Sequence, residues 1–67
     1  MENKLRELRE MMAMTQEDLA ASTGVSRQTI ISLERGKYNP SISLAHRLAQ
    51  VFHLTIEEIF IFEESED

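Results

Sequence analysis

The sequence of 67 residues contains no cysteine and no tryptophan, and it has one proline and two glycines. The absence of cysteine excludes disulfides, thiolate zinc sites and thiol catalysis. No apolar run approaches the roughly 20 residues that span a bilayer, and the charged, periodic N-terminus is not typical of a signal peptide. At this length we expect a single domain over residues 1–67, located in the cytoplasm. Such a domain buries only a modest core, so we also expect an oligomer.

The sequence also lacks the usual arrangements of catalytic and metal-binding residues. It suggests no Ser/His/Asp set, and both glycines, Gly24 and Gly36, are positioned as helix stops, which leaves none for a Gly-rich phosphate loop. His46 and His53 could lie on one side of a helix, but two histidines without a third ligand make a weak zinc site. The four methionines are more typical of core filling than of soft-metal binding. We therefore predict no enzymatic activity, no cofactor and no metal.

Charge is distributed unevenly along the chain, whose formal net charge is −5. Residues 1–25 and 48–67 carry an excess of acids. Between them, a basic segment holds one acid, Glu34, against four basic side chains, which are Arg27, Arg35, Lys37 and Arg47. A partner responds to the local field more than to the total charge, so this segment is compatible with a nucleic acid in spite of the acidic total.

Apolar residues repeat at helical spacing along the chain, which predicts an all-α fold of five short helices. The first lies near residues 3–12, with Leu5, Leu8 and Met12 on its apolar side. Three further helix starts share one pattern, in which an apolar residue and a Ser/Thr N-cap are followed by a second apolar residue five positions after the first. These are Met14-Thr15 with Leu19, Val25-Ser26 with Ile30, and Leu54-Thr55 with Ile59.

Caps and stops set the limits of the predicted helices. Thr15 with Asp18 forms a loose capping box, and Thr55 with Glu58 forms a full one. Ser41 is placed to cap the fourth helix, and the two glycines can end the second and third. The fifth helix is expected to reach about residue 60. The second and third helices are joined by the short segment TGVS, a tight turn typical of a helix-turn-helix, although a generic helical hairpin fits this pattern as well.

The third predicted helix has two different faces. Ile30 and Leu33 form its apolar face, whereas the opposite face carries no acid and consists of Arg27, Gln28, Ile31, Ser32 and Arg35. Arginine can pair with guanine and glutamine with adenine in the major groove, and both occur in the first turn, the end that contacts base edges in helix-turn-helix proteins. We assign the base-contacting role to Arg27, Gln28, Ser32 and Ile31. We assign contacts with the DNA backbone to Gln16, Ser26, Thr29, Arg35, Lys37, Tyr38, Asn39 and Ser41.

The segment MTQEDLAASTGVSRQTIISLERGKYNPS resembles the Cro/cI-type (XRE) helix-turn-helix family of repressors, and the whole chain is similar to its compact stand-alone members. The resemblance implies a five-helix lambda-repressor-like DNA-binding domain. It also implies a buried, structural ion pair between Arg9 and Glu34. The positions that match base-contacting residues of the family are Arg27, Gln28 and Ser32, and those that match DNA-backbone contacts are Gln16, Ser26, Lys37 and Asn39. The chain departs from the family at Ile31, where a small or polar residue is usual. There the isoleucine is either a single exposed apolar residue or a contact for a thymine methyl group.

In the C-terminal stretch IEEIFIFEESED, Ile56, Ile59 and Phe60 can cover the core, whereas Ile61 and Phe62 continue the apolar run past what one short helix can bury. A contiguous exposed apolar patch usually marks an interface, so we predict a two-fold homodimer through residues 55–62. The predicted interface residues are Ile56, Ile59, Phe60, Ile61 and Phe62. The alternation within this run also permits a short C-terminal strand. The acidic tail 63–67 would lie away from DNA.

Together these features predict a homodimeric transcriptional repressor that binds a palindromic double-stranded DNA operator through the major groove. We expect no small-molecule ligand and no membrane partner. The alternative is a protein-interaction module, such as an antitoxin-like or anti-repressor subunit, which would use the basic face or the apolar tail to hold another protein. A binding selection on random duplex DNA distinguishes the two.

Overall fold

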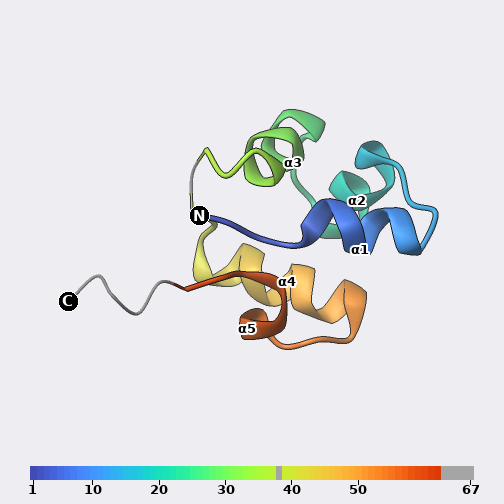
Figure 1. The fold of residues 1–67 in the computed structure, drawn as a ribbon. Coiled ribbons are helices and arrows are strands. Elements are labelled where there is room, and N and C mark those ends of the chain that lie inside the picture. The colour runs from blue at the N-terminus through green and yellow to red at the C-terminus, as the bar shows by residue number, and fades with distance from the viewer. Residues whose placement is uncertain (38, 63–67) are drawn as a thin grey trace.

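The computed structural model describes residues 1–37 and 39–62, and within these ranges it contains five helices (Figure 1). Their bounds are α1 Leu5–Met11, α2 Gln16–Thr23, α3 Arg27–Glu34, α4 Ile42–Phe52 and α5 Ile56–Ile59. The predicted all-α fold with five helices is therefore confirmed. In the described part of the chain no helix has the length and apolar character needed to cross a membrane.

Hydroxyl side chains begin the last four helices, as the sequence predicts. Thr15, Ser26, Ser41 and Thr55 each accept a hydrogen bond from the backbone N–H three residues later. The box at Thr15 is complete and not loose, because the Asp18 carboxylate also accepts the Thr15 N–H at 2.9 Å. These caps satisfy N–H groups that have no partner within the helix itself.

The helix ends differ slightly from the prediction. Thr23 belongs to α2, so the turn before α3 has three residues, beginning with Gly24 at a φ of 74°. This left-handed conformation is open to glycine at little cost. His53 ends α4 in the same conformation, with a φ of 57°. At the other end of the chain α1 stops at Met11, and the prediction that Met12 faces the core is wrong because that side chain is 51% exposed.

The hydrophobic core lies between α4 and α5 on one side and α1, α2 and α3 on the other (Figure 1). Helix α1 packs against α3, and α2 contacts both α3 and α4. Every helix contributes at least one fully buried side chain, and α4 contributes the most buried positions. The largest fully buried apolar residues are Leu5, Leu19, Ile30, Leu33, Leu48, Ile59 and Phe60.

The chain after α5 runs beside the N-terminus (Figure 1). Phe60 forms an isolated antiparallel bridge with Asn3, and within the described residues this bridge stands in place of the predicted C-terminal strand. Burial corrects part of the predicted dimer interface. Ile59, the last residue of α5, and Phe60, the bridged residue, are only 0% and 1% exposed, so both cover the core of their own chain and are not available to a partner.

The rest of the predicted interface remains accessible. Ile61 and Phe62 are 39% and 52% exposed, and Ile56 is half-buried. Residues 63–67, predicted as an acidic tail, and Tyr38, predicted as a DNA-backbone contact, lie outside the described residues.

Candidate nucleic-acid interface

Helix α3 separates a buried face from an outward face, as its residue pattern predicts. Ile30 and Leu33 are fully buried, where they join the core shared with α1 and α2. Arg27 and Gln28, in the first turn, are exposed. The rest of the outward face is Ile31 and Ser32, both half-buried, and the exposed Arg35. The predicted base-contacting residues therefore lie together on one side of one helix.

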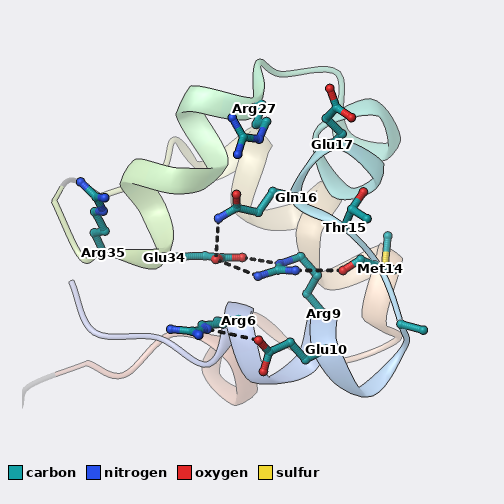
Figure 2. Close-up of a pocket in the computed structure, with 11 residues that line it drawn as sticks. Arg6, Arg9, Glu10, Met14, Thr15, Gln16, Glu17, Arg27, Glu34 and Arg35 are labelled. Carbon is teal, nitrogen blue, oxygen red and sulfur yellow. Dashed lines mark hydrogen bonds and ion pairs between the residues drawn. The ribbon is translucent and has the colours of Figure 1, made fainter.

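The only acidic residue of α3 is turned inward and bound by Arg9 (Figure 2). Arg9 Nε donates to Glu34 Oε2 at 2.7 Å, and Arg9 Nη2 donates to Glu34 Oε1 at 3.2 Å. The two side chains are 12% and 6% exposed, so the ion pair is largely shielded from water. The hydrogen bond to Glu34 raises the pKa of Arg9 above its already high usual value. This is the structural pair that the family resemblance implies.

The Arg9–Glu34 pair is also connected to α2. Arg9 Nη1 donates to the Met14 carbonyl at 2.9 Å, just before the cap of α2, and Gln16 Nε2 donates to Glu34 Oε1 at 3.2 Å. The network thus joins α1, the start of α2 and the last turn of α3 (Figure 2). Because the Glu34 charge is compensated inside this network, the outward face of α3 presents only neutral and positive side chains.

Polar groups predicted to contact the DNA backbone surround α3, and several have local roles in the fold. The Ser26 and Thr29 hydroxyls lie 3.0 Å apart and share a hydrogen bond at the start of α3. The Ser41 hydroxyl accepts the Leu44 N–H at the start of α4. Lys37 and Asn39 follow α3 and are exposed.

Gln16 stands at the first turn of α2, where one of its amide N–H groups goes to Glu34. The same turn carries Glu17 and Asp18, so it adds no positive charge of its own. The positive charge available to a phosphate near this turn comes instead from α3 and the loop that follows it.

Two arginines, Arg47 and Arg6, lie where the sequence did not predict them. Arg47 belongs to the basic segment, but its Nη1 donates to the Thr23 carbonyl at 2.7 Å and so covers the C-terminal end of α2. Arg6, on α1, is exposed beside Glu10 and lines the same open hollow as Arg27 and Arg35 (Figure 2). Only the helical phase of α1 places Arg6 near α3, and no motif in the sequence signals it.

The dimensions of α3 suit a DNA groove. An α-helix with its side chains is about 10–12 Å in diameter, and the major groove of B-DNA is about 12 Å wide. The outward face carries hydrogen-bonding groups in its first turn, positive charge at Arg27 and Arg35, and no exposed acid. Contact with base edges between two rows of phosphates requires such a face. The short turn into α3 and this face together define a helix-turn-helix DNA-binding domain.

Comparison with known proteins leads to the same class. A helix-turn-helix family model matches residues 5–59, and the chain belongs to this XRE-type helix-turn-helix family. An HTH-type transcriptional regulator of Methanocaldococcus jannaschii is 54% identical over 66 residues, which cover 98% of this chain and 100% of that protein. Another from Archaeoglobus fulgidus is 53% identical over 66 residues, covering 98% of this chain and 93% of that protein.

A solved structure gives the same result. The restriction-modification controller protein C.AhdI from Aeromonas hydrophila matches with a TM-score of 0.77 and 35% sequence identity, over 85% of this chain and 86% of that one. The family is a class of DNA-binding transcription regulators and not of enzymes.

Proposed function

We propose that this protein is a sequence-specific repressor that places α3 in the major groove of double-stranded DNA. The single observation that carries the proposal is the outward face of α3, which has no exposed acid because Glu34 is bound to Arg9. An ordinary surface helix mixes acids with bases, and an exposed acid at this place would repel the phosphates on either side of the groove. The chain as a whole has a net charge of −5, so a face without an exposed acid is a feature of this surface and not of the general composition.

Within this proposal the residues of α3 have different roles. Arg27 and Gln28 contact guanine and adenine edges from the first turn, and Ser32 contacts a base one turn later. Phosphate contacts would come from Lys37 and Asn39 after α3, which fix the position of the helix without distinguishing sequences. The remaining proposed backbone contacts are Gln16, Ser26, Thr29, Arg35 and Ser41.

A second copy of the chain would provide the second half of the recognition surface. Ile61 and Phe62 are exposed apolar side chains that follow directly on the buried Phe60, and the half-buried Ile56 lies beside Phe62 in one shallow apolar hollow. Burying them against the same residues of a partner gives a two-fold dimer. Such a dimer would bind a palindrome whose half-sites are about 34 Å apart and would repress by covering the DNA that polymerase must reach.

A selection from random duplex DNA at low salt tests the DNA-binding part of the proposal. We expect an enriched motif with two inverted halves. Enrichment without any common motif would contradict the proposal and would favour the alternative, a protein-interaction module that uses the same basic face or the apolar tail.

Light scattering tests the dimer separately. We expect the wild-type chain to be a dimer at micromolar concentration and Phe62→Ser to shift it toward a monomer. Met11→Ser is the matched control, because Met11 is an exposed apolar residue of α1 and does not belong to the proposed interface. A monomeric wild type, or equal effects of the two substitutions, would contradict the proposed interface.

A further inference from the structure

Asn3 connects three parts of the chain that are far apart in sequence. Its side-chain Nδ2 donates to the Leu33 carbonyl, in the last turn of α3, at 2.8 Å. Its Oδ1 accepts the Leu5 N–H, at the start of α1, at 3.0 Å. Its backbone forms the antiparallel bridge with Phe60. The side chain therefore binds α3 while the main chain binds the segment after α5.

The bridge at Asn3 is supported on both sides. The Lys4 N–H donates to the Ile59 carbonyl at 2.8 Å, and the Ile61 N–H donates to the Glu2 carbonyl at 2.9 Å. Figure 1 shows the N-terminal segment between the end of α3 and the chain that follows α5. The N-terminal segment thus links the end of α3 to the tail through the Asn3 side chain and the short bridge, and the Met1 ammonium adds a second contact at the Gly36 carbonyl, 3.1 Å away.

We propose that Asn3 is a positioning residue that fixes the orientation of α3 relative to the C-terminal dimer segment, and so determines which spacing between DNA half-sites the dimer accepts. The inference rests on the proposed function, since it needs α3 to contact DNA and residues 61–62 to contact a partner. The Leu33 carbonyl accepts the Gly36 N–H at 2.9 Å just after the helix, and Nδ2 adds a second donor to it from the N-terminal segment.

The geometry of DNA makes this orientation consequential. Half-sites bound by a two-fold dimer lie one helical turn apart, or about 10 base pairs, so adding one base pair rotates one half-site by roughly 35° about the axis. A dimer with rigidly held recognition helices cannot follow that rotation, so only one of its halves can bind. The gain in affinity from the second half-site, a factor of about 10² or more, is then lost. A dimer whose α3 helices can turn relative to the tail keeps part of this gain.

One substitution separates the contact with α3 from the contact with α1. Asn3→Asp keeps an oxygen that accepts the Leu5 N–H, and a carboxylate is favourable at the start of α1. The same substitution removes the donor to the Leu33 carbonyl, and with it the hydrogen bond of 3.2 Å from Nδ2 to the Met1 carbonyl. It also places a negative charge at the C-terminal end of α3, where it is unfavourable. A purely structural role in starting α1 would leave this variant like the wild type.

The experiment uses the full chain and three kinds of duplex. One carries a single half-site, one carries both half-sites at the spacing found in the selection, and one has one or two base pairs inserted between the half-sites. We expect the wild type to lose about 100-fold in affinity on insertion and Asn3→Asp to lose less than about tenfold, with half-site affinity within about twofold of the wild type. An unchanged spacing dependence in Asn3→Asp would overturn the inference. The inference would also be overturned if Asn3→Asp lost as much affinity for the single half-site as for the full site. A wild type that binds paired half-sites equally well at every spacing would overturn it too.

A measurement without DNA tests the same link and separates its failure from that of the proposed function. Amide hydrogen exchange reports the opening of the bridge through the Ile61 N–H, which donates to the Glu2 carbonyl. We expect Asn3→Asp to increase this exchange rate by about tenfold while the amides of α2 stay as in the wild type. Unchanged exchange at Ile61 would overturn the inference whether or not the protein binds DNA. An absence of any selected motif would instead contradict the proposed function.

Discussion

Arg9 and Glu34 are 25 positions apart and meet through two hydrogen bonds, 2.7 and 3.2 Å long, that connect α1 to the last residue of α3. The pair has two consequences. It holds α3 against the body of the protein, and it turns the one acid of α3 away from the surface proposed to contact DNA. The stability of the fold and the charge of the surface proposed to contact DNA therefore depend on the same interaction.

The first prediction concerns the stability of this pair. Arg9→Met leaves the Glu34 carboxylate poorly compensated inside the fold, and removing one partner of a buried pair costs about 3–5 kcal/mol of unfolding free energy. We expect a loss at the lower end of this range, since Arg9 retains some exposure. Urea denaturation followed by circular dichroism measures it.

The double variant Arg9→Met/Glu34→Met is the control for the pair. Because no charge is then left without a partner, we expect it to recover most of the loss. A double variant as unstable as the sum of the two single ones would show that the ion pair is not what these residues contribute.

The second prediction tests the base-contacting role of the first turn of α3. Gln28→Ala should weaken binding to the selected motif by roughly 1–3 kcal/mol and relax the preference at one base pair. Gln50→Ala is the matched control, because Gln50 is an exposed glutamine on α4. Binding to a set of single-base variants of the motif measures both. Equal losses on every variant, or equal losses for Gln28→Ala and Gln50→Ala, would contradict the assignment.

The limits of the helices could be predicted from the sequence because they depend on residues that are close along the chain. Each of the four capping hydroxyls binds an N–H three residues away, and this geometry arises in any fold that contains the helix. The outward face of α3 could be predicted for a similar reason, since helical periodicity alone separates Gln28 from Leu33.

Contacts between distant segments could not be predicted in this way. The sequence predicts that Ile59 and Phe60 cover the core and that Ile61 and Phe62 extend past it, but it does not predict that Phe60 pairs with Asn3 near the other end of the chain. The role of Arg47 likewise depends on the packing of α4 against α2, which brings it to the Thr23 carbonyl. Neither contact has a signal in the residues next to it.

The third prediction concerns the salt dependence of DNA binding. Lys37 is exposed just after α3, and we assign it to a phosphate. Lys37→Ala should therefore weaken binding to all DNA sequences alike and lower the slope of log affinity against log salt by about 1. Lys4→Ala removes the same charge from an exposed position at the start of α1 and is expected to leave the slope nearly unchanged. The same decrease in both variants would contradict a phosphate contact by Lys37.

The fourth prediction concerns pH and the cap of α2. The backbone N–H of Thr15, together with its side chain, lowers the pKa of Asp18. A carboxyl group whose pKa is lower in the folded state stabilises the fold at any pH above its unfolded pKa, and this stabilisation is lost as the pH falls through the folded pKa. The difference in unfolding free energy between the wild type and Asp18→Asn should thus be largest near neutral pH and vanish in strong acid.

Urea denaturation at a series of pH values from neutral to strongly acid measures this difference. Glu17→Gln removes a charge from the same first turn but keeps the Thr15–Asp18 hydrogen bonds, so it provides the background from the helix dipole alone. If the advantage of the wild type over Asp18→Asn persists at the acid end, the charge of Asp18 is not its source.

The last prediction concerns Ile31, the position at which this chain departs from the family pattern. Ile31 is half-buried on the outward face of α3, one turn after Arg27. We expect its side chain to contact a thymine methyl group in the major groove. Replacing that thymine by uracil should then weaken binding by roughly fourfold, because burying one methyl contributes about 0.8 kcal/mol. Replacing each thymine of the motif in turn, with affinity measured by fluorescence anisotropy, locates the contact.

Ile31→Ser should bind the thymine and uracil duplexes equally at that position while still losing affinity when the base pair opposite Gln28 is changed. If Ile31→Ser keeps the same sensitivity to uracil as the wild type, the methyl group is recognised by another residue and Ile31 is simply an apolar side chain at the surface.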